Sequence, residues 1–368
     1  MNTIPVKFIN FRADSRTNSI PEKIRRALKL NEFNNVFKKG EITALKVHFG
    51  EPGNTTFISP SYYQPIVEEL FKIGVKPYFS DTNTLYLGQR ANSVDHIKAA
   101  NYHGFNLSTF NVPVIIADGL LGHDVVSVEV NLKHFKTVPV ASAYYFSPAF
   151  MVVSHIKGHM AFGFGGAIKN VGMGMVGRAG KYRIHSSTKP ILKKEACLAC
   201  GLCIDICPQK ALFLNPEKVI DVYGMRCVGC GACIPACTQH VFRFKWDKPT
   251  KEMHERLAEA CFGVVKNKRA LYINFLTDIT PDCDCVSWSD APLARNIGIL
   301  LSQDPVAIDQ ASLDLLEKAV ALHPSALKPS IQSNPLHHLR PNIDSQYLLD
   351  YAEKINLGTR KYVLEEII

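Results

Sequence analysis

Short apolar runs alternate with amphipathic segments along most of this chain. Each run is too short for a typical helix, and unbroken apolar character over this length is typical of strands buried on both faces. We therefore predict strands at 6–10, 43–49, 75–80, 113–117, 151–156 and 270–276. Helical periodicity predicts helices at 19–30, 60–73, 94–102 and 251–266, with another after Asp304. The alternation predicts an α/β fold, with a mainly parallel sheet and flanking helices.

Two of the expected helix starts carry capping signals. Ser19 and Glu22 have the spacing of a capping box at the start of the helix at 19–30. Asp304 precedes Pro305, and this order suits an N-cap residue followed by the first helical position. We favour this capping role for Asp304 over a ligand role for Asp304 or Asp309.

Length and composition describe a globular protein of more than one domain. The chain has 368 residues, of which 46% are hydrophobic and 20% are charged. This composition excludes a disordered chain and a coiled coil, and the length exceeds that of one average domain. No apolar run reaches the roughly 18 residues of a membrane-spanning helix, and the N-terminus has no signal peptide pattern. We therefore expect a cytoplasmic protein that does not enter a membrane.

Eight of the eleven cysteines form a repeat with a period of 30 residues. Each set has the spacing C-x2-C-x2-C-x3-C, and Pro208 follows the first set. In this arrangement the first three cysteines bind one cubane cluster, and the fourth binds the other cluster. We therefore predict two [4Fe-4S] clusters, one on Cys197, Cys200, Cys203 and Cys237, and the other on Cys227, Cys230, Cys233 and Cys207.

Other uses of these cysteines fit the pattern less well. A disulfide framework is unexpected in a chain without an export signal. Zinc sites need only C-x2-C pairs, which leaves the third cysteine of each triplet unexplained. The segment resembles the bacterial two-cluster ferredoxin domain over about residues 190–245, although Thr238 stands where a second proline is usual. We expect three parts: an α/β domain at 1–189, a ferredoxin-type module at 190–245, and the second part of the α/β domain at 246–368.

The formal net charge of +9 does not indicate a nucleic-acid partner. Two clusters of about −2 each would reduce it to about +5. Lysine and arginine are also spread along the chain, without the clustered basic footprint of nucleic-acid-binding proteins. We expect the partner to be an electron donor or acceptor, either a protein or a small molecule.

Polar residues stand at or directly after the carboxyl ends of the predicted strands. His48, Asp81, Asp118 and His155 mark four of these ends. Ligands of open parallel sheets bind beyond this edge, so we expect a cleft there. Further polar residues follow the same strands, namely Glu51, Asn54, Thr82, Asn83, Arg90, Lys157 and His159.

A glycine-rich segment at 163–170 comes next in the chain. Its glycines allow the backbone to approach a ligand closely, and Lys169 and Asn170 at its end are candidates for binding a phosphate or carboxylate of a cofactor. The segment fits neither the dinucleotide-binding fingerprint nor the P-loop. A tight turn packed against the ferredoxin-type module is the alternative.

Three cysteines lie outside the repeat. Cys261 falls on the apolar face of a predicted helix and is expected to be a small buried hydrophobe. Cys283 and Cys285 are two residues apart, so in extended chain both sulfurs point the same way. They could bind an additional metal ion together with His155 and His159, or remain a pair of reduced thiols. If they share a site, one histidine should lie within about 10 Å of one thiol.

Several segments are similar to the family called domain of unknown function 362, in the form that carries a two-cluster ferredoxin insert. They are His155-Ile-Lys-Gly-His159, Phe164-Gly-Gly-Ala-Ile-Lys169-Asn170, Gly172-Met-Gly174, Cys283-Asp-Cys285 and Ser302-Gln-Asp304-Pro-Val-Ala-Ile-Asp309. Val47-His48-Phe49-Gly50-Glu51 and Ile116-Ala117-Asp118-Gly119 fit the family as well. The similarity spans nearly the whole chain. It implies an iron–sulfur protein but supplies no reaction.

Two functions fit these observations. In the first, the chain is an iron–sulfur oxidoreductase, whose clusters pass electrons to a substrate or metal site in the α/β cleft. In the second, it is a ferredoxin-like electron carrier, or a cluster or assembly factor, with no chemistry of its own. We favour the first, because a carrier alone does not need some 300 further residues. The chain has no flavin, nicotinamide or radical-SAM motif.

Overall fold

An eight-stranded sheet forms the centre of the computed structural model, which describes residues 3–185, 190–207, 209–227, 231–243 and 250–367. Across the sheet the strands are β16 (Tyr362–Glu366), β1 (Ile4–Asn10), β15 (Gly298–Ser302), β14 (Arg269–Leu276), β7 (Ala149–His155), β2 (Ile42–Lys46), β3 (Lys76–Asp81) and β4 (Val114–Ile116). Only β15 is antiparallel to its two neighbours, and all other adjacent pairs in this sheet are parallel. The α/β fold with a mainly parallel sheet is confirmed.

Strand β7 shows why these runs are apolar without alternation. Phe150 and Val152 belong to the apolar core on one face of the sheet, whereas Met151 and Val153 belong to the core on the other face. Successive side chains of a strand point to opposite faces, and here both faces are covered. All seven residues of β7 are buried as a result.

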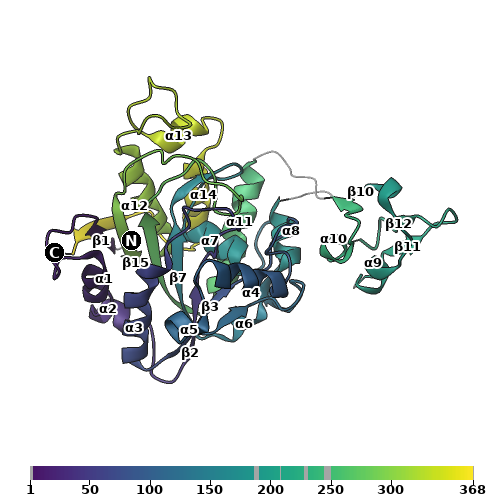
Figure 1. Ribbon diagram of the computed structural model, residues 1–368, viewed down its shortest axis with the longest axis horizontal. Coiled ribbons are helices and arrows are strands. Elements are labelled where there is room, and N and C mark those ends of the chain that lie inside the picture. Colours follow the sequence, from purple (N-terminus) through teal and green to yellow (C-terminus); the bar gives the residue numbers. More distant parts are fainter. Residues whose placement is uncertain (1–2, 186–189, 208, 228–230, 244–249, 368) are drawn as a thin grey trace.

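Helices cover both faces of the sheet (Figure 1). One face carries α1 (Ile20–Leu28), α3 (Tyr63–Ile73) and α4 (Ser93–Tyr102). The other carries α7 (Ala167–Gly174), α11 (Lys251–Val265), α12 (Pro305–Glu317) and α14 (Ser345–Lys354). Shorter helices are α2 (Asn31–Asn34), α5 (Leu107–Phe110), α6 (Ser142–Phe146), α8 (Arg178–His185) and α13 (Pro335–Leu339), with a 3-10 turn η1 (Pro60–Tyr62). Two hairpins lie outside the sheet, β5 (Val125–Glu129) with β6 (Thr137–Ala141), and β8 (Lys157–His159) with β9 (Gly163–Gly165).

The two predicted helix starts have different outcomes. The side chain of Asp304 accepts hydrogen bonds from the backbone N–H groups of Val306 and Ala307, so its capping role is confirmed. Ser19 is the N-cap residue of α1 but makes no side-chain capping bond, so the predicted capping box is wrong. The Glu22 carboxylate pairs with Arg25 at 2.5 Å instead of accepting a hydrogen bond from the backbone N–H of Ser19.

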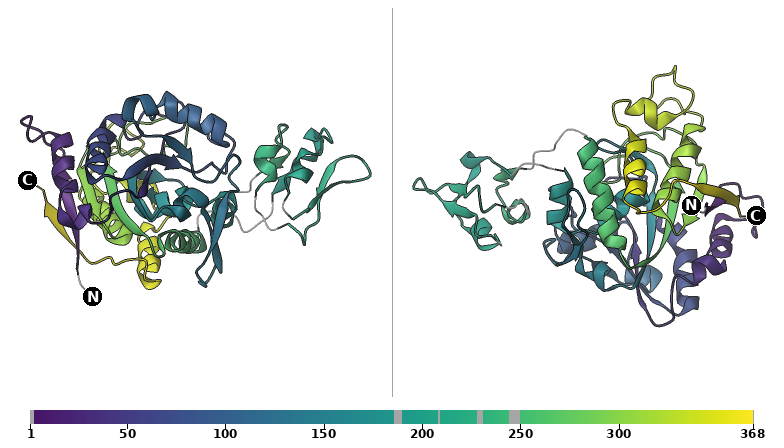
Figure 2. Two further views of the ribbon diagram at one scale, coloured as in Figure 1. Left: turned by 90° about the horizontal axis from the view of Figure 1, so that it is seen from below. Right: turned by 180° about the vertical axis from the view of Figure 1, so that it is seen from behind.

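The cysteine-rich segment is a separate unit at one end of the molecule, beyond α8 (Figures 1 and 2). We call its described residues, 190–207, 209–227 and 231–243, the cysteine module. It contains η2 (Lys194–Ala196), α9 (Leu202–Asp205), α10 (Cys233–Ala236), and the two-stranded sheets β10 (Ile191–Leu192) with β13 (Phe242–Arg243) and β11 (Leu212–Leu214) with β12 (Ile220–Val222). Cys230 and Pro208 lie outside the described residues.

The cysteine module contacts the α/β domain at α8. Tyr182 of α8 and Leu85 belong to the same apolar cluster as Ile234 of the module. At Gly231 the approach is close, because an added Cβ would lie 3.4 Å from the Tyr182 ring and 3.5 Å from Leu85. The second cysteine set therefore faces the α/β domain.

Among the residues that the structure describes, no helix combines the length and the apolar character that a membrane span requires.

Candidate functional site

A cavity of about 330 Å³ lies beyond the carboxyl ends of β2, β3 and β7. The cleft expected at this edge of the sheet is therefore present. The predicted residues that line it are His48, Asp81, Thr82, Arg90, His155, Lys157, His159, Lys169, Asn170, Cys283 and Cys285. Glu51 and Asp118 do not line the cavity, but each contacts a cationic side chain that does.

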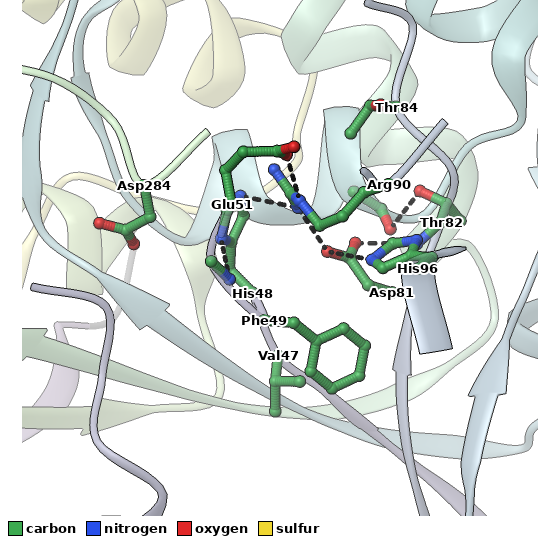
Figure 3. Close-up of polar contacts among 12 residues, drawn as sticks. Val47, His48, Phe49, Glu51, Asp81, Thr82, Thr84, Arg90, His96 and Asp284 are labelled. Atoms are coloured by element: carbon green, nitrogen blue, oxygen red, sulfur yellow. Dashed lines mark hydrogen bonds and ion pairs between the residues drawn. The ribbon is translucent and has the colours of Figure 1, made fainter. Parts of the chain in front are cut away.

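A buried network of charges forms one wall of the cavity (Figure 3). Lys46 Nζ lies 3.0 Å from the Asp81 carboxylate, and Arg90 lies 2.9 Å from Glu51 and 3.5 Å from Asp81. Burial alone would raise the pKa of Asp81, but the cations of Lys46 and Arg90 hold it below its ordinary value. Arg90 also approaches His48 Nε2 at 3.3 Å. Burial lowers the pKa of Lys46, and Asp81 opposes this shift, so the network places Lys46 and Arg90 against the same carboxylate in this wall.

Asp284 organises the opposite wall. Its carboxylate accepts from Lys157 Nζ at 2.6 Å and from His155 Nδ1 at 3.0 Å. His155 Nε2 faces the carbonyl oxygen of Thr277 at 2.7 Å, so each ring nitrogen faces an oxygen acceptor. Burial opposes ionisation of Asp284, but His155 and Lys157 outweigh it and lower its pKa. His155 is thus engaged on both sides, and the prediction that it joins a shared metal site with the thiols finds no support.

The two thiols of the cleft lie together with His159. Donor atoms of His159, Cys283 and Cys285 are all within 4.8 Å of one another, so the predicted proximity of a histidine to these thiols is confirmed. Lys169 Nζ donates to Cys283 Sγ at 3.3 Å. A hydrogen bond from the Cys285 thiol lowers the pKa of Cys283, although burial opposes this, and the ammonium of Lys169 lowers it further. The same hydrogen bond and burial raise the pKa of Cys285. Cys283 is the thiolate of the pair.

Whether His159, Cys283 and Cys285 suit a metal ion depends on the hydrogen bonds of the His159 ring. Its Nδ1 accepts from the backbone N–H groups of Ala161 and Phe162, at 3.1 and 3.3 Å. Burial, and then the charge of Lys169, lower its pKa, so the ring is neutral and carries its proton on Nε2. A metal-bound histidine usually has the opposite arrangement and donates its free N–H to an acceptor. The spacing would admit an open site of two cysteines and one histidine, but Nδ1 of His159 already accepts from the backbone and Nε2 carries the proton.

The glycine-rich loop does not form the anion cradle that was one of its two predicted roles. The carboxylate of Asp309, from α12, occupies the N-terminus of α7 and accepts from the backbone N–H groups of Ala167 and Ile168 at 2.7 and 2.9 Å. Burial raises the pKa of Asp309 to about 6. Asn170 bonds to Lys46 and to the backbone and side chain of β7, so neither Asn170 nor this loop is open to an external anion. Lys169 lines the cavity together with Gly165, Gly166 and Asn170.

Three basic residues of the cavity were missed by the sequence analysis. Lys46 stands inside an apolar strand, and a lone lysine in such a run is a signal that could have been used. Lys181 and His185 are four apart on α8, which places them on one face of the helix. Lys181 lies 3.9 Å from Asp118, and burial lowers the pKa of Lys181 to about 8 while it raises that of Asp118 to about 6.

The sulfurs of the cysteine module accept several backbone hydrogen bonds. Cys197 Sγ accepts from two N–H groups at 3.4 Å, Cys207 Sγ accepts from one at 3.2 Å, and Cys237 Sγ from one at 3.4 Å. Burial raises the pKa of Cys203 to about 11, and the nearby Cys237, Cys200 and Cys197 add to this. Cys203 of the first set and Cys237 of the second belong to the same buried apolar cluster.

Comparison with known proteins gives a family but no activity. The family model described as Domain of unknown function (DUF362) matches residues 43–314. No curated protein matches the chain. Among solved structures, the lactate racemase apoprotein from Thermoanaerobacterium thermosaccharolyticum aligns with a TM-score of 0.36 and 11% identity over 74% of this chain and 51% of its own. A protein from Thermotoga maritima aligns with a TM-score of 0.36 and 10% identity over 76% and 54%. The chain spans about half the length of either.

Proposed function

The chain belongs to the family described as Domain of unknown function (DUF362), and from its site we propose that it is an iron–sulfur redox protein. Eight cysteines, Cys197, Cys200, Cys203, Cys207, Cys227, Cys230, Cys233 and Cys237, would hold two [4Fe-4S] clusters. Such clusters, when bound, supply single electrons at low potential, here to a substrate or metal site in the α/β cleft. The reaction class is that of an oxidoreductase.

The position of Cys237 carries this proposal. Cys237 of the second set and Cys203 of the first are buried in the same apolar cluster, as the crossed two-cluster arrangement requires. The backbone N–H groups that point at Cys197, Cys207 and Cys237 suit thiolates of a cluster, since hydrogen bonds to sulfur tune its potential. The ten cysteines that the structure describes form no disulfide, which fits a reducing compartment, and we propose the cytoplasm.

Helix α8 connects the cysteine module to the cleft. Tyr182 packs against the module, and Lys181 and His185 of the same helix line the cavity. Arg178, at the start of α8, is buried, which lowers its pKa to about 10, and the thiolate of Cys233 opposes this shift. The second cysteine set therefore stands next to the helix whose other face forms the cavity wall. This placement supports an enzyme rather than a carrier.

The basic residues of the cleft can bind and orient an anionic substrate. Lys46 and Arg90 hold one wall through Asp81, and Asp284 holds His155 and Lys157 on the other. Lys169 and the N–H of His159 are donors that can stabilise negative charge as it develops on the substrate. Lys169 is half-buried and the other groups are buried, so water screens their charges little.

A carrier or assembly factor is the second candidate, and one observation favours it. Cys200 is exposed, and the side chains of Leu198 and Leu202 beside it are 69% and 52% exposed. Met225 of the same module is fully exposed. Apolar side chains around an accessible cluster ligand would suit docking of an electron-transfer protein.

Anaerobic purification with metal and sulfide analysis tests the proposal. We expect about eight iron and eight acid-labile sulfides per chain, and a coupled EPR spectrum after reduction with dithionite. Four iron, or zinc in place of iron, would reject the two-cluster assignment. To separate enzyme from carrier, small molecules that co-purify should be identified by mass spectrometry and added to the reduced protein. Reoxidation that is lost in Lys46→Met but kept in Lys98→Met would support the enzyme.

A further inference from the structure

We propose that Cys283 and Cys285 are a redox-active dithiol that reduces a small anionic disulfide in the cleft. This role rests on the proposed function, because the oxidised pair must be reduced again by a one-electron donor. In this role the reacting atoms are the two sulfurs, the substrate is an anionic disulfide, and two electrons are transferred per turnover.

The two sulfurs are held in place by the residue between them. Asp284 is fixed through its carboxylate by Lys157 and His155, and its carbonyl oxygen accepts from the backbone N–H of Glu51 at 2.9 Å. Both thiols line the cavity, and their donor atoms lie within 4.8 Å of each other. A fixed pair at this separation can close to a disulfide by a small side-chain rotation.

The pair is electrically asymmetric, as a nucleophile and its resolving thiol should be. Lys169 Nζ contacts Cys283 at 3.3 Å, whereas the hydrogen bond with Cys283 and burial raise the pKa of Cys285. Among the described residues, no carboxylate lies within ion-pair distance of Lys169. Cys283 is therefore the attacking thiolate, and Cys285 is the thiol that resolves the mixed disulfide.

The orientation of His159 favours this chemistry over a metal site. Because Nδ1 accepts from two backbone N–H groups, the ring carries its remaining hydrogen on Nε2, and one nitrogen of this ring lies within 4.8 Å of both sulfurs. An N–H donor stabilises a thiolate, and a departing thiolate as well, but it cannot bind a metal without losing its proton.

The charge of the cleft points to an anionic substrate. The Asp284 carboxylate lies between the ammonium of Lys157 and the ring of His155, so its charge is already paired within the wall. Once Cys283 is bonded to another sulfur, the ammonium of Lys169 has no anionic partner among the described residues. The walls then carry a positive excess in a cavity of about 330 Å³, which is the size of a small-molecule site.

The reaction balances in two exchanges. Cys283 thiolate attacks one sulfur of the substrate disulfide, that S–S bond breaks, and the leaving thiolate takes a proton. Cys285 then loses its proton and attacks the sulfur of Cys283, which forms the Cys283–Cys285 disulfide and releases the second thiol. Two electrons pass from the dithiol to the substrate. Two single electrons from the one-electron donor, with two protons, restore the dithiol.

Peptide mass spectrometry reads the state of the pair directly. Trypsin cleavage after Arg269 and Arg295 releases residues 270–295, in which Cys283 and Cys285 are the only cysteines. After the anaerobic holoprotein reacts with dithiobis-nitrobenzoate, a disulfide with a carboxylate on each ring, this peptide should lose the mass of two hydrogens. Dithionite should restore two alkylatable thiols. Residues 257–266, with the buried Cys261, are the internal control and should not change.

Rates test the assigned roles and the substrate charge. Relative to a free reference thiol, the protein should react about tenfold faster with dithiobis-nitrobenzoate than with cystamine, a disulfide with an ammonium at each end. Lys169→Met should abolish this preference, Lys169→Arg should restore part of it, and the exposed Lys98→Met should keep it. Cys283→Ser should lose the fast phase, whereas Cys285→Ser should stop at the mixed disulfide.

Three outcomes would reject the dithiol. These are an unchanged 270–295 peptide, equal relative rates with both disulfides, and one tightly bound metal ion per chain that is lost in Cys283→Ser. Iron analysis separates this result from the proposed function. Full iron content with an inert peptide rejects the dithiol alone, whereas a reactive peptide in a chain that binds no iron rejects the iron–sulfur proposal.

Discussion

The ammonium nitrogen of Lys169 lies 3.3 Å from the sulfur of Cys283, although 114 positions separate the two residues in the chain. Lys169 is supplied by α7 and Cys283 by the loop after β14, and the two elements meet at the carboxyl edge of the sheet. The contact places a cation against a buried thiol, which favours the thiolate. The reactive character of the cleft therefore depends on a pairing between distant segments.

The crossed cysteine sets predict that one substitution harms both. Cys237→Ala removes the fourth ligand of the first set, and Cys207→Ala removes that of the second. Because the two halves of the module are held together through these residues, we expect either variant to retain four iron or fewer, from about eight. Iron and sulfide analysis after anaerobic reconstitution, with limited proteolysis of 190–246, gives the readout. Cys261→Ala is the control, and an intact, protease-resistant module in Cys207→Ala would contradict the crossed arrangement.

Loss of the buried cation at position 46 should be costly. Lys46→Met removes the ammonium that lies 3.0 Å from the Asp81 carboxylate, while that carboxylate stays buried. Because the remaining contacts of Asp81 do not replace this partner, we expect the free energy of unfolding to fall by about 3–5 kcal/mol. Lys98→Met is matched to it, since the Lys98–Asp95 pair is exposed and should contribute less than about 1 kcal/mol. Urea unfolding of both variants measures the difference, and equal effects would show that the network does not stabilise the fold.

Two adjacent glycines should differ in their tolerance of a methyl group. At Gly166 an added Cβ would lie 2.4 Å from the Asp309 carboxylate oxygen, whereas at Gly165 the nearest atoms are 3.8 Å away. Gly166→Ala should therefore destabilise the protein by about 1–3 kcal/mol, because Asp309 must move from the N-terminus of α7. Gly165→Ala should cost clearly less. Chemical unfolding decides the matter, and similar losses for both variants would mean that Asp309 can shift freely.

His96 should contribute to acid destabilisation. Burial lowers its pKa to about 3; Asp81 opposes the shift, while Arg90 and Lys46 add to it. The folded value thus lies below the ordinary value of 6.5, and the unfolded chain takes up the proton first as the pH falls. The stabilising contribution is therefore complete above pH 6.5 and is lost as the pH falls toward 3.

Replacement of His96 by phenylalanine should make the free energy of unfolding depend less steeply on pH. Between pH 6.5 and 4 the free energy of unfolding should fall less steeply than in the wild type, by up to about 1.4 kcal/mol per pH unit. His338→Phe, at an exposed position, is the control and should keep the wild-type slope. Unfolding measured across this range would contradict the assignment if His96→Phe had the same slope as the wild type.

Local patterns in the sequence were sufficient for much of the fold. The predicted strands at 6–10, 43–49, 75–80, 113–117, 151–156 and 270–276 correspond to β1, β2, β3, β4, β7 and β14. The edge strand β16 and the antiparallel β15 were not predicted. Four of the five residues of β16 are exposed, so it lacks the apolar signal of a buried strand. The five residues of β15 follow a long irregular segment without a helix to mark them.

The chemistry of the site was predicted only as far as single elements allow. Residues at strand ends, the 30-residue cysteine repeat and the Cys283–Cys285 pair are visible in the sequence, because strand ends share one edge and short spacings limit how side chains can point. Tertiary structure decided that Asp309 fills the glycine-rich loop, that Asp284 engages His155, and that Lys169 meets Cys283. Each of these contacts joins residues more than 100 positions apart. Local periodicity records which face of an element is buried, whereas such pairings depend on the order of strands in the sheet and the packing of helices upon it.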